Sequence, residues 1–249
     1  WKQFNGCCFA DLDLKQQGVI EDFQLLFYII QPPTPERVKY DIFDRVNRGG
    51  TPLNKQEMRN ALYRGRCTRM LDKLCCSPEF LIATGRSINK ERMKDQYVVL
   101  RAIAFLMLHR GEFKDIPALQ YRGDIDDFLA RFMVYVNDNA PEKLIVDYEN
   151  LFIRCMQISY DLLGENGFRF SGNGIRRPIN MPLFEALSYL FSFVPEKIDY
   201  TWASRLILDI ESVKEEFDDS RYFSGNIDST TSVSFRFDRM DKITNRIQL

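Results

Sequence analysis

The feature that most constrains the fold is a succession of apolar stripes at helical spacing after residue 66. Residues three and four apart share one face of an α-helix, so each stripe predicts an amphipathic helix. One stripe consists of Leu144, Tyr148, Leu151, Cys155, Ile158 and Leu162. Comparable stretches predict helices near 67–75, 90–109, 124–137, 142–163, 182–193, 201–219 and 232–246. Glycine and proline fall in the connections, so this part of the chain is predicted to be a helical bundle.

The first 66 residues carry a different pattern. Residues 11–22 predict a short helix, and residues 24–30 form a continuous apolar run that predicts a buried strand. A single strand leaves its backbone groups unpaired, so we expect its partners upstream or in another chain. The chain is thus predicted to be mainly α, with the end of an α/β unit in residues 1–66 and a helical domain in residues 67–249.

Composition excludes some classes of protein. A chain of 249 residues can bury a large core, and its formal net charge of -1 gives no overall attraction to nucleic acid. Residues 37–73 nevertheless hold ten Lys or Arg against four acids, which predicts a local positive face. No apolar run approaches the roughly 18 residues needed to cross a membrane. We therefore expect a cytoplasmic protein without a membrane partner.

Cysteine and histidine give little support for a metal site. The six cysteines include no Cys-x-x-Cys pair, and His109 is the only histidine. We expect the cysteines to be buried, reduced thiols and His109 to act as a cation at a helix C-terminus. Residues 224–232, rich in Ser, Thr, Gly and Asn, are expected to form a flexible loop, and Arg236 and Arg239 to be surface or ion-pair residues.

The most distinctive stretch runs from residue 42 to residue 62. It predicts the end of a helix that starts at 34–36, a glycine turn, and a second helix capped by Asn54 with Glu57 in capping-box position. A helix N-terminus beside glycines and arginines is suited to a phosphate group. The candidate phosphate- or nucleotide-binding residues are Arg45, Asn47, Arg48, Gly49, Gly50, Gln56, Arg59 and Asn60. The alternative is a structural corner in which Arg45 pairs with a neighbouring aspartate.

A second candidate lies in the glycine-rich segment 164–177. Arg169, Arg176 and Arg177 alternate there with Phe168 and Phe170. Arginines and aromatic rings in a loop can bind the phosphates and bases of single-stranded nucleic acid, so these three arginines are candidate nucleic-acid contacts. The alternative is a connector whose phenylalanines attach it to the core.

Four motifs carry a resemblance to a known family. The first is Arg45-Val46-Asn47-Arg48-Gly49-Gly50 followed by Leu53-Asn54-Lys55-Gln56-Glu57-Met58-Arg59-Asn60. The second joins residues 92–96 to 99–105, the third joins 178–180 to 183–185, and the fourth is 233–237. In this order they resemble the GmrSD-type restriction proteins, whose N-terminal region is related to the ParB/sulfiredoxin fold. The resemblance spans most of the chain.

The resemblance implies a restriction or anti-phage function. The complete protein would bind and hydrolyse a nucleoside triphosphate with Mg²⁺ and act on foreign or modified DNA, with a nuclease domain or subunit as partner. The family's Asp-Gly-Gln-Gln-Arg motif is expected upstream of residue 1, and Lys15-Gln16-Gln17-Gly18 does not replace it. The chain is therefore interpreted as a fragment without a cofactor or catalytic residues of its own. The alternative is a non-catalytic helical module that links a partner or nuclease domain.

Overall fold

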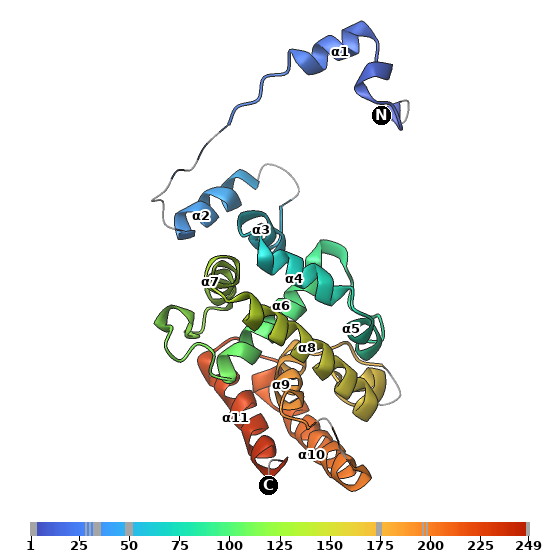
Figure 1. Cartoon of the computed structure of the whole chain (residues 1–249), viewed down its shortest axis with the longest axis vertical. Coiled ribbons are helices and arrows are strands. Elements are labelled where there is room, and N and C mark those ends of the chain that lie inside the picture. The colour runs from blue at the N-terminus through green and yellow to red at the C-terminus, as the bar shows by residue number, and fades with distance from the viewer. Residues whose placement is uncertain are drawn as a thin grey trace. The chain divides into compact units, whose positions relative to one another are not determined.

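The computed structural model describes residues 4–27, 29, 31, 36–47, 52–172, 176–195, 197 and 199–247. The chain divides into two compact units, Trp1–Arg45 and Val46–Leu249. Helices dominate both units, and the described residues contain no strand (Figure 1). The mainly α prediction is therefore confirmed. The boundary predicted at residue 66 falls inside the second unit, at the first residue of the helix Arg66–Cys75.

The first unit holds η2 (Phe9–Asp11), α1 (Leu14–Glu21) and most of α2 (Glu36–Asn47). Asp13 starts α1 as its N-cap, because its carboxylate accepts the backbone N–H of Gln16 at 2.8 Å. The helix predicted over residues 11–22 is thus observed from Leu14 to Glu21. Residues 34 and 35, the predicted start of the next helix, lie outside the described residues.

The strand predicted over residues 24–30 is not observed among the described residues. Its described residues have no regular secondary structure, and Leu25, Leu26, Phe27 and Ile29 are all exposed. Within the described chain the run therefore has none of the β pairing that a buried strand needs. The apolar composition was the only basis for the prediction, and composition does not supply a pairing partner.

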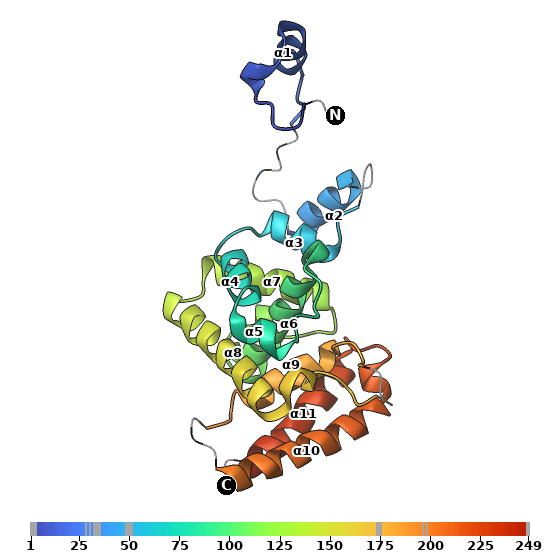
Figure 2. The same cartoon turned by 90° about the vertical axis from the view of Figure 1, so that its right-hand side faces the viewer.

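The second unit is a bundle of helices (Figures 1 and 2). Its α-helices are α3 (Lys55–Leu62), α4 (Arg66–Cys75), α5 (Pro78–Ala83), α6 (Lys94–His109), α7 (Ile125–Asp138), α8 (Glu142–Leu163), α9 (Met181–Phe191), α10 (Tyr200–Asp218) and α11 (Thr230–Ile247). Single 3-10 turns are η3 (Glu91–Met93), η4 (Pro117–Leu119), η5 (Gly164–Asn166) and η6 (Arg221–Phe223). The predicted helices agree with these bounds within a few residues. The short α5 was not predicted, because six residues are too few to show a helical period.

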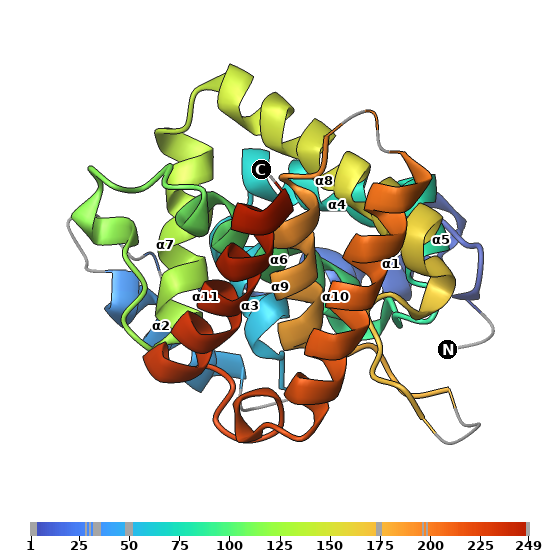
Figure 3. The same ribbon diagram turned by 90° about the horizontal axis from the view of Figure 1, so that it is seen from below.

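Helix α6 forms the centre of this unit. Apart from Arg101, its stretch from Val98 to Met107 is apolar and buried, and the part from Ala102 to Leu106 is fully buried. Helices α4, α7, α8 and α9 pack against it, and α11 packs against α9 (Figure 3). A helix that is apolar all round must be covered on every side, so α6 requires this surrounding layer.

Several polar groups behave differently from the expectations of the sequence. His109 does not act as a charged cap: burial, together with Arg236, lowers its pKa from 6.5 to about 3, and its ring stacks on Phe237 at 3.6 Å.

Cys67, Cys75 and Cys155 are buried as predicted, whereas Cys7, Cys8 and Cys76 are exposed. Three of the six cysteines are therefore surface thiols.

Candidate functional site

Helix α3, which follows the predicted glycine turn, begins after Asn54 as expected. The Asn54 side chain accepts the backbone N–H groups of Gln56 and Glu57 at 2.8 and 2.9 Å, and Glu57 accepts the N–H of Asn54 at 2.6 Å. The predicted capping box is therefore confirmed. It fixes the first turn of α3 and the direction of the side chains that follow.

Arg59 lies on the buried side of α3. Only 1% of the residue is exposed, whereas the sequence suggested a solvent-facing anchor. Its guanidinium donates to Asp126 of α7 at 2.8 Å and to Gln56 at 3.0 Å, and it lies over the Tyr97 ring. Asp126 also accepts from Lys55. Burial acts to raise the pKa of Asp126, but these two cations outweigh it and hold the pKa below its ordinary value. The corner thus contains a structural ion pair.

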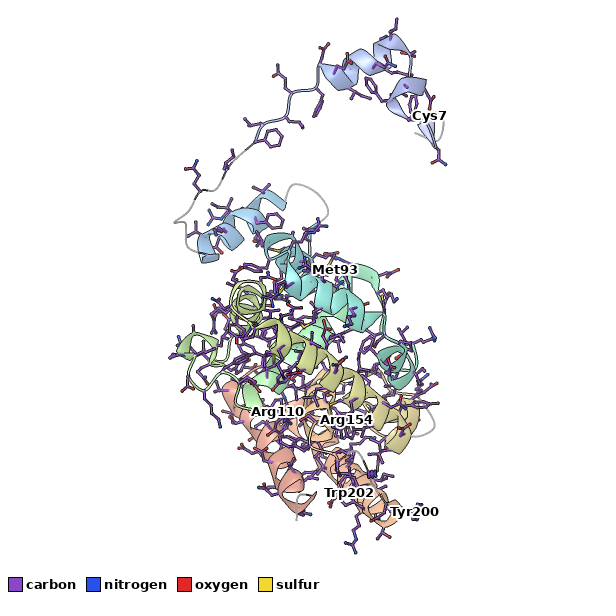
Figure 4. The ribbon with its side chains drawn as sticks, in the orientation of Figure 1. Cys7, Met93, Arg110, Arg154, Tyr200 and Trp202 are labelled. Carbon is purple, nitrogen blue, oxygen red and sulfur yellow. The ribbon has the colours of Figure 1, made fainter. Side chains whose placement is uncertain are left out.

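The neighbouring turn η3 has an unusual backbone. Arg92 and Met93 have φ values of 56° and 58°, so two consecutive non-glycine residues occupy the left-handed region. Asn54 donates its side-chain amide to the Arg92 carbonyl at 2.7 Å. Arg92 donates to Glu57 at 3.0 Å and to the Pro52 carbonyl at 2.6 Å. The first two motifs of the resemblance are therefore joined at this turn, and Met93 lies beside α3 (Figure 4).

A cavity of about 520 Å³ lies between α3, η3 and the start of α6. Four cationic side chains, Lys55, Arg59, Arg92 and Lys94, contribute to its walls, together with the acids Glu91 and Asp126. Lys94 is exposed and forms no ion pair with any described residue. The cavity is thus net positive, and its size suits a small ligand.

The other residues predicted to bind phosphate lie in different parts of the chain and do not all reach this cavity. Gln56 donates to Asn60 at 2.8 Å, and Asn60 donates to Gln96 of α6. These two amides thus connect α3 to α6. Arg45 is an exposed residue of α2 in the first unit. Asn47 ends α2, and Arg48, Gly49 and Gly50 lie outside the described residues. The sequence did not point to Tyr97 or Asp126, because both come from other helices.

The three arginines of the 164–177 segment line a second cavity, of about 620 Å³. Arg176 pairs with Glu165 at 2.9 Å, Arg177 pairs with Asp218, and Arg169 is only 4% exposed. Phe168 and Phe170 are buried, Phe168 against Phe184 and Phe170 against Phe223. Neither ring is available to stack on a base, so the arginines are brought together but the predicted stacking platform is absent from the described segment.

The third and fourth motifs meet in the core. Glu185 of α9 accepts from Arg101 of α6 and, at 2.6 Å, from Arg236 of α11, and the three side chains are fully buried. Burial acts to lower the pKa of Arg101, and Glu185 and Asp228 raise it well above its ordinary value. The Ile227 carbonyl accepts from Arg236 at 2.6 Å, so the loop 224–229 is bonded to the core at Ile227 and Asp228. Arg236 is therefore an ion-pair residue and not a surface residue.

Two further arginines attach the end of α9. Arg110 donates to Ser192 at 3.0 Å, and Arg154 donates to the Val194 carbonyl. Arg110 is exposed and Arg154, on α8, is partly buried (Figure 4). These two arginines therefore connect α8 and the end of α6 to the residues that follow α9.

Comparisons of the chain with protein-family models, with curated proteins and with solved structures give no match. Among the described residues, no helix has both the length and the apolar character needed to cross a membrane. Within the same part of the chain, no three His, Cys, Asp or Glu side chains are grouped so as to hold a metal ion.

Proposed function

We propose that this chain is the helical portion of a GmrSD-like restriction protein, and that the cavity beside η3 receives phosphate oxygens of a nucleotide. The observation that carries the proposal is the Arg92–Met93 turn. Its left-handed backbone is maintained by three hydrogen bonds to the Pro52–Glu57 segment. Backbone strain of this kind costs about 1–3 kcal/mol per residue and is found most often at ligand clamps and switch regions.

The charges of the cavity support a phosphate ligand. Lys55, Arg59 and Arg92 each have a carboxylate partner, whereas Lys94 has none among the described residues. Lys94 is also the first residue of α6, whose N-cap Met93 provides no side-chain cap. The positive end of the helix macrodipole and an unpaired ammonium group thus occupy the same wall, and both favour an anion.

The activity of the complete protein follows from the resemblance. It would bind and hydrolyse a nucleoside triphosphate with Mg²⁺ in the cytoplasm and act on foreign or modified DNA. In this proposal the present chain supplies contacts to the phosphates and no catalytic group. A steady-state phosphate-release assay on the purified chain should therefore show no turnover. Turnover that persists on further purification and is lost in Lys94→Ala would contradict this division of roles.

Nucleotide binding tests the cavity directly. Titration of the chain with Mg²⁺–ATP and Mg²⁺–GTP should give a Kd that rises about tenfold in Lys94→Ala, because one charge-assisted contact is lost. Lys90→Ala is the matched control: it removes an exposed lysine four residues away that does not line the cavity. Equal affinities of wild type, Lys94→Ala and Lys90→Ala would overturn the proposal.

A second candidate function is supported by the first unit. Leu25, Leu26, Phe27 and Ile29 expose 67–80% of their surface, which is unfavourable in water. A helical module that links a partner chain or a nuclease domain would cover such a run. Light scattering on the native protein is the test. A particle of 29.3 kDa, the mass of this chain alone, would remove support for this function.

A further inference from the structure

The second cavity lies between η5, the segment that follows it, and α10, and it does not involve the residues of the first cavity. Four cationic side chains line it: Arg169, Arg176, Arg177 and Lys214. Two acidic side chains, Glu165 and Glu211, accompany them. The lining therefore has an excess of positive charge.

The pairing of these charges leaves one cation without an acidic partner. Glu165 pairs with Arg176 and Glu211 pairs with Lys214, each at 2.9 Å, and Arg177 pairs with Asp218. Arg169 donates to the carbonyls of Glu165, Thr84 and Arg177 and to the Ser87 hydroxyl. None of these acceptors carries a charge, although Arg169 is 4% exposed. A buried guanidinium without a counter-charge is uncommon, because burial of an unpaired charge is costly.

Arg169 also keeps donor capacity. A guanidinium has five N–H donors, and the described residues accept four hydrogen bonds from it. Burial and then repulsion by the neighbouring Arg176 lower the pKa of Arg169, whereas Glu165 acts to raise it. An anion between them would remove the repulsion and accept the remaining N–H.

We propose that this cavity binds a phosphomonoester dianion, with Arg169 as the buried anchor and Arg176 and Lys214 as its walls. No carboxylate of the described residues pairs with Arg169, so its positive charge favours an anion, and a tetrahedral phosphate offers more oxygens to the surrounding donors than a carboxylate does. The side-chain donors of Arg169 and Arg176 and of Lys214 on α10 come from different parts of the lining and can bind different oxygens of a tetrahedral group. The volume of about 620 Å³ leaves room for the organic part of a nucleotide-sized molecule.

A terminal phosphate fits this cavity better than a phosphate inside a nucleic-acid backbone. An internal phosphodiester continues in two directions and needs a groove open at both ends, whereas the proposed anchor Arg169 is only 4% exposed. Phe170 is 6% exposed and is covered by Arg177, so the cavity offers no surface for successive bases. The phosphomonoester could belong to a free nucleotide or to the 5′ end of an oligonucleotide.

Isothermal titration of the chain at low salt distinguishes these sources. The probes are inorganic phosphate, AMP, and one short single-stranded DNA prepared with and without a 5′-phosphate. Binding of phosphate and AMP without binding of either DNA would identify a free nucleotide as the source. Binding of the DNA only when it carries a 5′-phosphate would identify a strand end. Absence of phosphate and AMP binding, or equal binding of the two DNAs, would overturn the proposal.

Paired variants test the site residues. Arg176→Gln should weaken phosphate binding about tenfold, and Glu165→Gln should strengthen it, because Glu165 competes with the ligand for Arg176. Arg239→Gln is the matched control, since Arg239 is another partly exposed arginine that pairs with a glutamate outside the cavity. Circular dichroism melting checks that each variant is folded. Equal affinities of Arg176→Gln, Glu165→Gln and Arg239→Gln would contradict the proposal.

Discussion

The guanidinium of Arg59 is enclosed by Asp126, Gln56 and the ring of Tyr97. Arg59→Ala should lower the free energy of unfolding by about 2 kcal/mol, because a buried charge-assisted hydrogen bond is lost and Asp126 keeps only Lys55. Urea unfolding measures this change. Lys55→Ala removes the more exposed partner of the same carboxylate and should cost less than about 1 kcal/mol. A smaller effect of Arg59→Ala than of Lys55→Ala would contradict the assignment of Arg59 as a structural residue.

His109 gives the fold a dependence on pH. Its pKa is 6.5 in the unfolded chain and about 3 in the folded chain, because burial and Arg236 disfavour the imidazolium. Between these values the unfolded state binds a proton that the folded state does not bind, so stability is lost as pH falls from 6.5 towards 3. The slope approaches about 1.4 kcal/mol per pH unit.

Urea unfolding of wild type and His109→Phe between pH 7 and pH 4 isolates this contribution. Phenylalanine retains the stacking on Phe237 and cannot take up a proton. The variant should lose less stability than wild type as the pH falls. Parallel curves for the two proteins would show that His109 contributes no pH dependence.

At the scale of elements, the start of α3 is held by its own cap and also by a distant turn. Asn54→Ala removes the two cap hydrogen bonds and the bond to the Arg92 carbonyl. We expect a loss of about 1–2 kcal/mol in thermal or urea unfolding. Asp124→Ala at the start of α7 is the control, because the Asp124 side chain caps its own helix and bonds to no other element among the described residues. The Asn54 variant should also weaken nucleotide binding in the η3 cavity, whereas the Asp124 variant should not.

At the scale of the whole second unit, Arg101, Glu185 and Arg236 join three helices through one buried network. Glu185→Gln leaves two buried arginines without their shared carboxylate, so we expect a loss of about 3–5 kcal/mol. The triple variant Arg101→Met, Glu185→Leu, Arg236→Met removes every charge of the triad and should recover most of that loss. Denaturant unfolding of both proteins is the measurement. A triple variant as unstable as Glu185→Gln would mean that the ions themselves are required.

The helices of the second unit were predictable from the sequence because their signals are local. The apolar stripe of 142–163 coincides with α8, and Asn54 with Glu57 predicted the cap of α3. Hydrophobic period and capping depend on residues a few positions apart. The sequence also singled out four of the cavity-lining cations, because arginines beside glycine and amide residues are visible in it: Arg59, Arg169, Arg176 and Arg177. It did not single out the other four, which are Lys55, Arg92, Lys94 and Lys214.

Which of those cations are buried, and what they bind, was decided by the tertiary structure. Arg59 is buried because the fold places it against Asp126 of α7, which lies 67 residues further along the chain. Arg236 is buried and His109 is partly buried because α11 and α6 pack into the same core. The apolar run at 24–30 predicted a strand, but strand formation requires a second segment at hydrogen-bonding distance, and none is present among the described residues. Local periodicity therefore determined where the helices are, whereas the charges obtained their roles only when distant helices brought their partners into contact.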